Sequence, residues 1–228
     1  MIDSRTHSKR RRTWARMGLP ICVIVLAPAL ATAGEAPDLT PYLQRDDVIP
    51  KLEKGEYVSI KNAEFPKVFG DETVGDGEGT LIMFLVPASE KTAWDVIHDF
   101  NGHHAYMPHM KNSVLQESTG TNHRVRYTFD VLWIKTDAMM LGESLPEQQT
   151  LIWHVVPEGT DKRLKGLNIF WRIQEYEDGR TLMAYFQNIK HSTSINSLGA
   201  KLLASPKSSA RAMREEVEAR SRPTVADD

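Results

Sequence analysis

Residues 124–133 read Arg-Val-Arg-Tyr-Thr-Phe-Asp-Val-Leu-Trp, and this stretch decides the fold. From Arg124 to Val131 the polar and apolar side chains alternate without a break. Successive side chains of a β-strand point to opposite faces of a sheet, so the alternation predicts a strand with one apolar face. The apolar face must be covered, which calls for neighbouring strands and a further layer.

Four more strand candidates follow along the chain. Each is rich in apolar side chains and is bounded by proline, glycine or acidic residues of the kind found in turns. Sequential strands joined by short turns pair as an antiparallel meander. The candidates are residues 138–144, 150–156, 167–176 and 181–189, with turns at Pro146-Glu147, Pro157-Glu158-Gly159 and Glu177-Asp178-Gly179-Arg180.

Two strands and a helix precede the meander. Residues 56–60 and 80–86 are predicted to pair as a hairpin across a glycine-rich connection. A helix is then expected to begin at Ser89, whose hydroxyl suits an N-terminal cap, and to end at Asn101-Gly102. Its buried face is predicted to carry Ala93, Trp94, Ile97 and Phe100.

The last predicted element is a helix with one apolar and one charged face. Pro206 is expected to kink this helix or to split it in two. The charged face indicates that the helix lies on an apolar surface, and the concave face of the sheet is the expected partner. The apolar positions are Ile195, Leu198, Leu202, Leu203, Ala210, Met213 and Val217.

Residues 1–33 read as a signal peptide rather than as part of the fold. A basic run precedes uncharged apolar residues from Met17 to Ala33, which end in small residues that suit cleavage. Export to the periplasm is therefore expected. An uncleaved anchor in the inner membrane is the alternative, because the apolar run is close to the minimum of about 17 residues for a membrane span.

The rest of the chain divides into a helical lead at 34–51, one domain at 52–220 and a disordered tail at 221–228. Without residues 1–33 it holds 22 Lys and Arg against 29 Asp and Glu, a net charge of −7. Nucleic-acid binding needs clustered basic side chains, so no such partner is expected. The single cysteine, Cys22, lies in the signal peptide, which excludes cysteine chemistry in the domain.

The order of elements and several motifs resemble the START-like superfamily, also called SRPBCC, which includes polyketide cyclases, coenzyme Q-binding proteins and Bet v 1-like lipid-binding proteins. Residues 87–100 resemble the entry into the family's first grip helix, and residues 106–110 resemble the segment that follows. Residues 52–56 and 166–171 look like exported bacterial members. The resemblance covers about residues 52–220. It implies an α+β helix-grip fold, a curved antiparallel β-sheet wrapped around a long C-terminal α-helix.

A curved sheet closed by one helix leaves an apolar cavity wherever side chains do not fill it. Aromatic and methionine side chains at strand spacing suit a cavity wall, although they suit a plain core equally well. His154 lies between Trp153 and Val155 and can point to either face. The candidate cavity residues are Tyr106, Met107, Tyr127, Phe129, Trp133, Trp153, His154, Trp171, Tyr185 and Leu202.

Four histidines, at 98, 103, 104 and 109, raise the question of a metal site. Their spacings match no recurring zinc arrangement, and the helix stop at Asn101-Gly102 separates His98 from the others. An exposed polar cluster at the cavity mouth is expected instead. No metal, cofactor or catalytic residue is assigned, since no nucleophile and base pattern can be read.

The resemblance implies a non-enzymatic protein that binds and carries a hydrophobic small molecule or lipid, such as a sterol-like, isoprenoid or quinone compound. Residues 99–110 would form the gate, with transient membrane contact through Tyr106, Met107 and Met110. A polyketide cyclase or aromatase that uses one or more of His154, Arg172 and Tyr185 is the alternative. A structural module with a filled interior is the third possibility.

Overall fold

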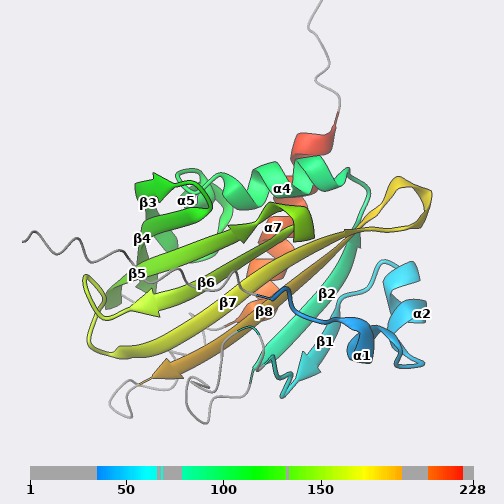
Figure 1. The fold of residues 1–228 in the computed structure, drawn as a ribbon, viewed down its shortest axis with the longest axis horizontal. Helices are drawn as coiled ribbons and strands as arrows, with labels where there is room; N and C mark the ends of the chain where they lie inside the picture. Colours follow the sequence, from blue (N-terminus) through cyan, green and yellow to red (C-terminus); the bar gives the residue numbers. More distant parts are fainter. Residues whose placement is uncertain (1–34, 66–67, 69–78, 132–133, 192–204, 223–228) are drawn as a thin grey trace, which may run out of the picture. The chain divides into compact units, whose positions relative to one another are not determined.

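The computed structural model describes residues 35–65, 68, 79–131, 134–191 and 205–222, all within the unit Thr32–Asp228 (Figure 1). Its centre is an eight-stranded antiparallel sheet in the order β1-β2-β8-β7-β6-β5-β4-β3. The meander predicted from β4 onward is confirmed, and β8 returns to pair with β2. The strands are β1 (Val58–Lys61), β2 (Thr80–Val86), β3 (Met110–Thr119), β4 (Asn122–Val131), β5 (Ile134–Leu145), β6 (Thr150–Val156), β7 (Leu164–Glu175) and β8 (Thr181–His191).

Turn chemistry favours the predicted hairpin between β7 and β8. Asp178 and Gly179 have φ angles of 60° and 70°, the left-handed region that aspartate tolerates and glycine adopts freely. The pairing then continues in register from Glu175↔Thr181 to Gly166↔Lys190. The predicted hairpin between the first two strands is also present, because β1 pairs antiparallel with β2.

The described helices are α1 (Thr40–Leu43), α2 (Val48–Glu53), α4 (Glu90–His98), α5 (His103–Tyr106) and α7 (Pro206–Ser221). Helix α4 begins as predicted, since the Ser89 hydroxyl accepts a hydrogen bond from the Thr92 N–H at 3.1 Å. Helix α7 begins at Pro206, which suits the first helical position because proline has no N–H to donate. Residues 192–204 lie outside the described part, and with them the predicted apolar positions 195, 198, 202 and 203.

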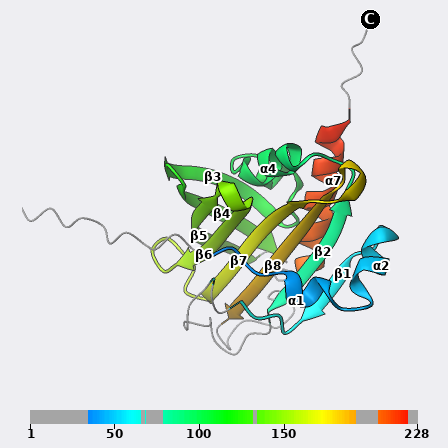
Figure 2. The ribbon, with the colours of Figure 1, turned by 45° about the vertical axis from the view of Figure 1, so that its right-hand side comes forward.

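Helix α7 lies on the face of the sheet that β2 and β8 form, and it crosses α4 near one end (Figures 1 and 2). Ala210, Met213 and Val217 are completely buried there, as the apolar periodicity predicts. Arg220 of α7 pairs with Asp99 at the end of α4 at 2.7 Å. The curved antiparallel sheet with a C-terminal helix on one face is the predicted fold class.

The opposite face of the same sheet has a core of its own. Strand β2 sends Ile82, Phe84 and Val86 toward α7, while Leu81, Met83 and Leu85 point the other way. Both sets are buried, which explains why the β2 sequence is continuously apolar instead of alternating. The second core is covered by the chain from Leu39 to Phe65.

Helices α1 and α2 therefore belong to the domain core and are more than a lead that precedes it. Leu39, Val48 and Leu52 are buried in the second core, where Phe65 packs edge-on against Phe170 and Phe186 at centroid distances of 4.7 and 5.0 Å. Helix α2 also crosses the boundary expected at residue 52.

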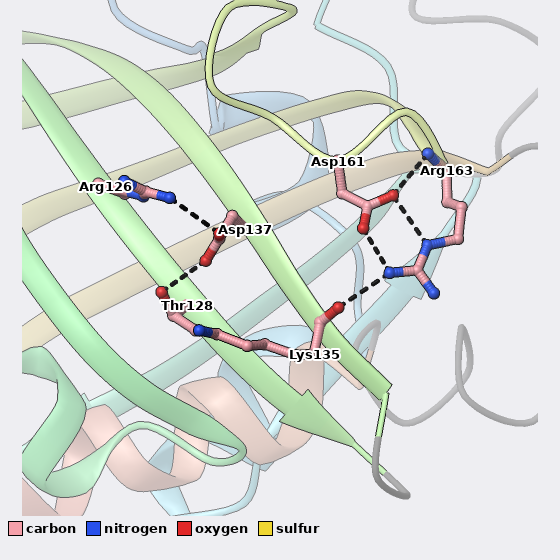
Figure 3. A network of polar contacts seen from close by, with 6 residues as sticks. All are labelled: Arg126, Thr128, Lys135, Asp137, Asp161 and Arg163. Atoms are coloured by element: carbon pink, nitrogen blue, oxygen red, sulfur yellow. Dashed lines mark hydrogen bonds and ion pairs between the residues drawn. The ribbon is translucent and has the colours of Figure 1, made fainter.

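A polar network holds β4, β5 and the connection after β6 together on the face that points away from α7 (Figure 3). Asp137 accepts hydrogen bonds from Arg126 at 2.9 Å and from Thr128 at 2.7 Å. Asp161 pairs with Arg163, whose guanidinium also donates to the Lys135 carbonyl at 2.8 Å. These bonds fix the strand ends whose other faces carry Tyr127, Phe129 and Thr136.

Within the residues that the structure describes, no helix is long and apolar enough to cross a membrane. The predicted signal peptide or anchor at 1–33 lies outside them.

Replacing Leu52 by Ala tests whether α2 is part of the core. Leu52 is 0% exposed, so the lost methyl groups and the cavity left behind should lower the free energy of unfolding by about 2–4 kcal/mol. The matched control is Ile49→Ala on the same helix, because Ile49 is 37% exposed and should cost less than about 1 kcal/mol. Urea unfolding measures both; equal losses would contradict a buried role for α2.

Candidate functional site

An apolar cavity of about 90 Å³ lies between α7 and the sheet. Strands β4 to β8 supply most of its wall, α5 and the start of β3 supply one end, and Ser209 and Met213 of α7 close it. Aromatic rings dominate this wall: Tyr127, Phe129, Trp153, Trp171 and Tyr185. The large side chains have not filled the space between helix and sheet, so the interior is not a solid core.

Six of the ten candidate residues line this cavity: Met107, Tyr127, Phe129, Trp153, Trp171 and Tyr185. Trp133 and Leu202 lie outside the described residues. Tyr106 is half-buried but does not line the cavity; its hydroxyl donates to the Val96 carbonyl at 3.1 Å and so fastens α5 to α4.

The structure corrects the prediction that His154 lines the cavity, because its side chain is exposed and lies outside the lining. Trp153 takes the inward direction on β6, and the next side chain of a strand must then face outward. Arg172 follows Trp171 on β7 in the same way, and its guanidinium donates to the Pro37 carbonyl at 2.8 Å on the opposite face. Of the three residues named for the enzymatic alternative, only Tyr185 therefore lines the cavity.

The aromatic wall is held by ring contacts and by one glycine. Trp171 stacks on Tyr185 with centroids 4.4 Å apart, and Trp153 contacts Tyr127 edge-on at 6.3 Å. Gly142 of β5 stands opposite Trp153, and a Cβ there would lie 2.4 Å from the indole ring. Only glycine lets the indole lie flat against β5.

A β-bulge in β7 brings one more apolar side chain to the wall. The pairing between β7 and β8 shifts between Leu164 and Gly166, which inserts one extra residue into β7. Leu164 and Leu167 consequently both line the cavity although they are three positions apart. Strict alternation would place them on opposite faces.

His103 is the cavity residue that the sequence analysis assigned to the wrong environment. It is 5% exposed instead of lying in an exposed cluster, and its Nδ1 atom is 3.0 Å from the Tyr127 hydroxyl. Burial lowers the pKa of His103 to about 4, although the carbonyls of Ile97 and Val96 act in the opposite direction. The ring is therefore neutral at pH 7. Its Nε2 atom has no hydrogen-bond partner among the described residues.

A second polar group lies on β8 and α7. The Tyr185 hydroxyl donates to Gln187 Oε1 at 2.7 Å, and Ser209 of α7 lines the cavity beside them. Burial raises the pKa of Tyr185, an effect that a hydrogen bond from Ser209 partly opposes. No sequence motif announces this group, because its members come from two elements.

The four histidines near α5 do not converge. His104 and His109 are exposed, and His98 bonds away from the cavity. In the described part of the chain, no three His, Cys, Asp or Glu side chains are placed to hold a metal ion.

No protein-family model matches the chain, and no curated protein matches it in sequence. Solved structures do match. The Zhui aromatase/cyclase from Streptomyces sp. R1128 superimposes with a TM-score of 0.55 at 15% identity, over 63% of this chain and 95% of that one. A STAR-related lipid transfer protein from Xanthomonas axonopodis gives 0.54 at 15% identity, over 71% and 98%. A START superfamily protein from Mycobacterium smegmatis gives 0.50 at 11%, over 63% and 96%.

The chain has the START-like fold. The resemblance stated from the sequence motifs is confirmed at this level. An aromatase/cyclase and a lipid transfer protein share the fold, so the START-like architecture alone does not choose between catalysis and transport.

Outside the cavity, a directed hydrogen-bond chain ties α4 of the START-like domain to the sheet. The Trp94 carbonyl only accepts, so His98 donates from Nδ1 at 3.0 Å and, when neutral, accepts from the Ser144 hydroxyl at Nε2, 2.7 Å away. Ser144 then accepts from His123 Nε2 at 2.8 Å, and His123 Nδ1 accepts from Ser118 at 3.0 Å. The carbonyl at one end thus fixes both tautomers.

The buried His103 makes the stability of the START-like domain depend on pH. Its folded pKa of about 4 lies below the ordinary value of 6.5, so the unfolded chain binds the proton first, and stability is lost as the pH falls from 6.5 toward 4. Between pH 7 and pH 5 the contribution of His103 to this loss should be about 2 kcal/mol. His103→Gln should remove that contribution, while those of His98, His123 and His154, whose pKa values desolvation also lowers, remain. Urea unfolding at both pH values measures the change. His104→Gln, on an exposed neighbour, should leave it intact; an unchanged pH dependence in His103→Gln would refute the assignment.

The hydrogen-bond chain predicts the tautomers of two histidines. Nitrogen-15 NMR of the imidazoles at pH 7.5 should find His98 protonated on Nδ1 and His123 on Nε2. Ser144→Ala should cost about 1–2 kcal/mol in the free energy of unfolding, because two ring nitrogens lose their partner. Ser118→Ala, at the exposed end, should stay within about 0.5 kcal/mol. The reverse tautomers would exclude this bonding scheme.

Proposed function

We propose that this START-like domain binds a hydrophobic small molecule or lipid in the cavity and carries it without chemical change. The observation that carries the proposal is an interior wall of five aromatic rings and four methionines that leaves space between helix and sheet. Apolar surface in such a space gains about 25 cal/mol for each Å² that a ligand removes from water.

The size of the cavity limits the ligand unless the wall moves. An apolar cavity of roughly 150 Å³ is enough to bind benzene, so about 90 Å³ holds only part of a lipid. Four wall residues, Met107, Met110, Met140 and Met213, are unbranched and adaptable, and can make way for a longer ligand. Two of them lie at the gate segment 99–110.

The pKa values of the polar wall residues favour ligand transport over cyclase chemistry. General acid and base catalysis works best when the pKa values lie near the working pH. His103 has a pKa of about 4, and burial raises the pKa of Tyr127 well above its ordinary value. The pair is therefore a weak base beside a weak acid, better suited to holding the wall together than to moving protons.

The proposed setting is the periplasm, where a lipid in transit must be shielded from water. Residues 1–33 support export by their basic run and apolar core. Transient membrane contact through the segment 99–110 would let a ligand enter or leave without crossing bulk water.

Filling the cavity should weaken the binding of an apolar probe. N-phenyl-1-naphthylamine, which fluoresces in apolar surroundings, should bind the wild type, and Ile169→Trp should weaken its binding at least about tenfold because an inward indole occupies the space. His154→Trp is the matched control, since it adds the same ring to an exposed position outside the cavity. Fluorescence titration of folded proteins measures both. Equal binding by both variants would rule the cavity out as the site.

A further inference from the structure

The charge of the cavity wall identifies the ligand more closely than its apolar character does. Among the described residues, no Lys, Arg, Asp or Glu lines the cavity. Trp153 and Trp171 each have one indole N–H donor, and the other polar members of the wall are His103, Tyr127, Thr136, Tyr185, Gln187 and Ser209. The threonine, glutamine and serine side chains do not ionise, whereas the histidine and the tyrosines can.

The titratable wall residues are also neutral. Burial disfavours the imidazolium and lowers the pKa of His103 to about 4, so the ring is neutral at pH 7. Burial raises the pKa values of Tyr127 and Tyr185, which keeps both phenols protonated. At pH 7 the described wall therefore carries no charge.

Several charged side chains near the wall in sequence point elsewhere and are paired. Arg126 and Asp137 bond to each other on the outer face of β4 and β5 (Figure 3). Their neighbours in the chain, Tyr127 and Thr136, line the cavity. On α7, the helix that carries Ser209, Arg214 pairs with Glu218 at 2.7 Å. None of these groups is free to neutralise a charge inside the cavity.

We infer that the ligand is an uncharged molecule whose polar group is a hydroxyl or a carbonyl and not a carboxylate, sulfonate or phosphate. This inference rests on the proposed function, since it specifies the class of the bound molecule. A hydroxyl can exchange hydrogen bonds with Tyr185, Gln187 and Ser209, whereas an anion would leave water without a counter-charge.

The test compares three probes of equal chain length by isothermal titration calorimetry at pH 7.5: 1-octanol, octanamide and octanoate. Both neutral probes should bind at least about tenfold more tightly than octanoate. Octanoate that binds as tightly as octanamide would overturn the inference while leaving the proposed function in place. Binding of none of the three would remove the proposed function and this inference with it.

A variant that adds the missing charge sharpens the test. Ser209→Arg puts a permanent cation at a half-buried wall position. The affinity for octanoate should then rise at least about tenfold, while the affinity for octanamide should not rise. Gln116→Arg adds the same charge on an exposed residue of β3 outside the cavity and should change neither affinity. Equal gains in the two variants would assign the effect to net charge and overturn the role of the wall.

Discussion

The alternation of side chains along the strands is the constraint on which the structure depends, because it ties the cavity to the opposite face of the sheet. Tyr127 and Phe129 face the cavity only while Thr128 points outward to Asp137. A slip of one residue in β4 would send the phenol into the outer network and the threonine into the cavity. The outer bonds among Arg126, Thr128 and Asp137 therefore help to set the register on which the wall depends.

Both faces of the sheet are covered, but they are covered differently. On the outer face, Phe65, Phe170 and Phe186 form an aromatic cluster beneath the N-terminal chain. On the inner face, Trp153, Trp171 and Tyr185 lean on other rings and leave space under α7. Rigid packing behind β7 and β8 supports these strands, so the inner wall holds its form without filling the interior.

Much of the fold could be predicted from the sequence, because strands, caps and helix faces have local signatures. The alternation around Phe129, the cap at Ser89 and the spacing of Ala210, Met213 and Val217 are of this kind. The direction of His154 could not be predicted, since Trp153 and Val155 on either side are both apolar. The burial of His103 was missed because a helix of four residues has no periodicity to read. The bulge before Gly166 depends on pairing with β8 and leaves no local signal.

The polar groups of the wall bear on the proposal that a fold shared with an aromatase/cyclase carries its ligand unchanged here. His103 bonds to Tyr127, and Tyr185 bonds to Gln187, so each pair already has one hydrogen bond inside the protein. A polar group already bonded inside the protein has less to offer a ligand than one that must find a partner. In the proposed function, affinity comes from buried apolar area and fit, and the uncharged wall disfavours charged ligands. His103 Nε2 is buried without a hydrogen-bond partner among the described residues, and because the ring is neutral at pH 7 it adds no charge to the wall.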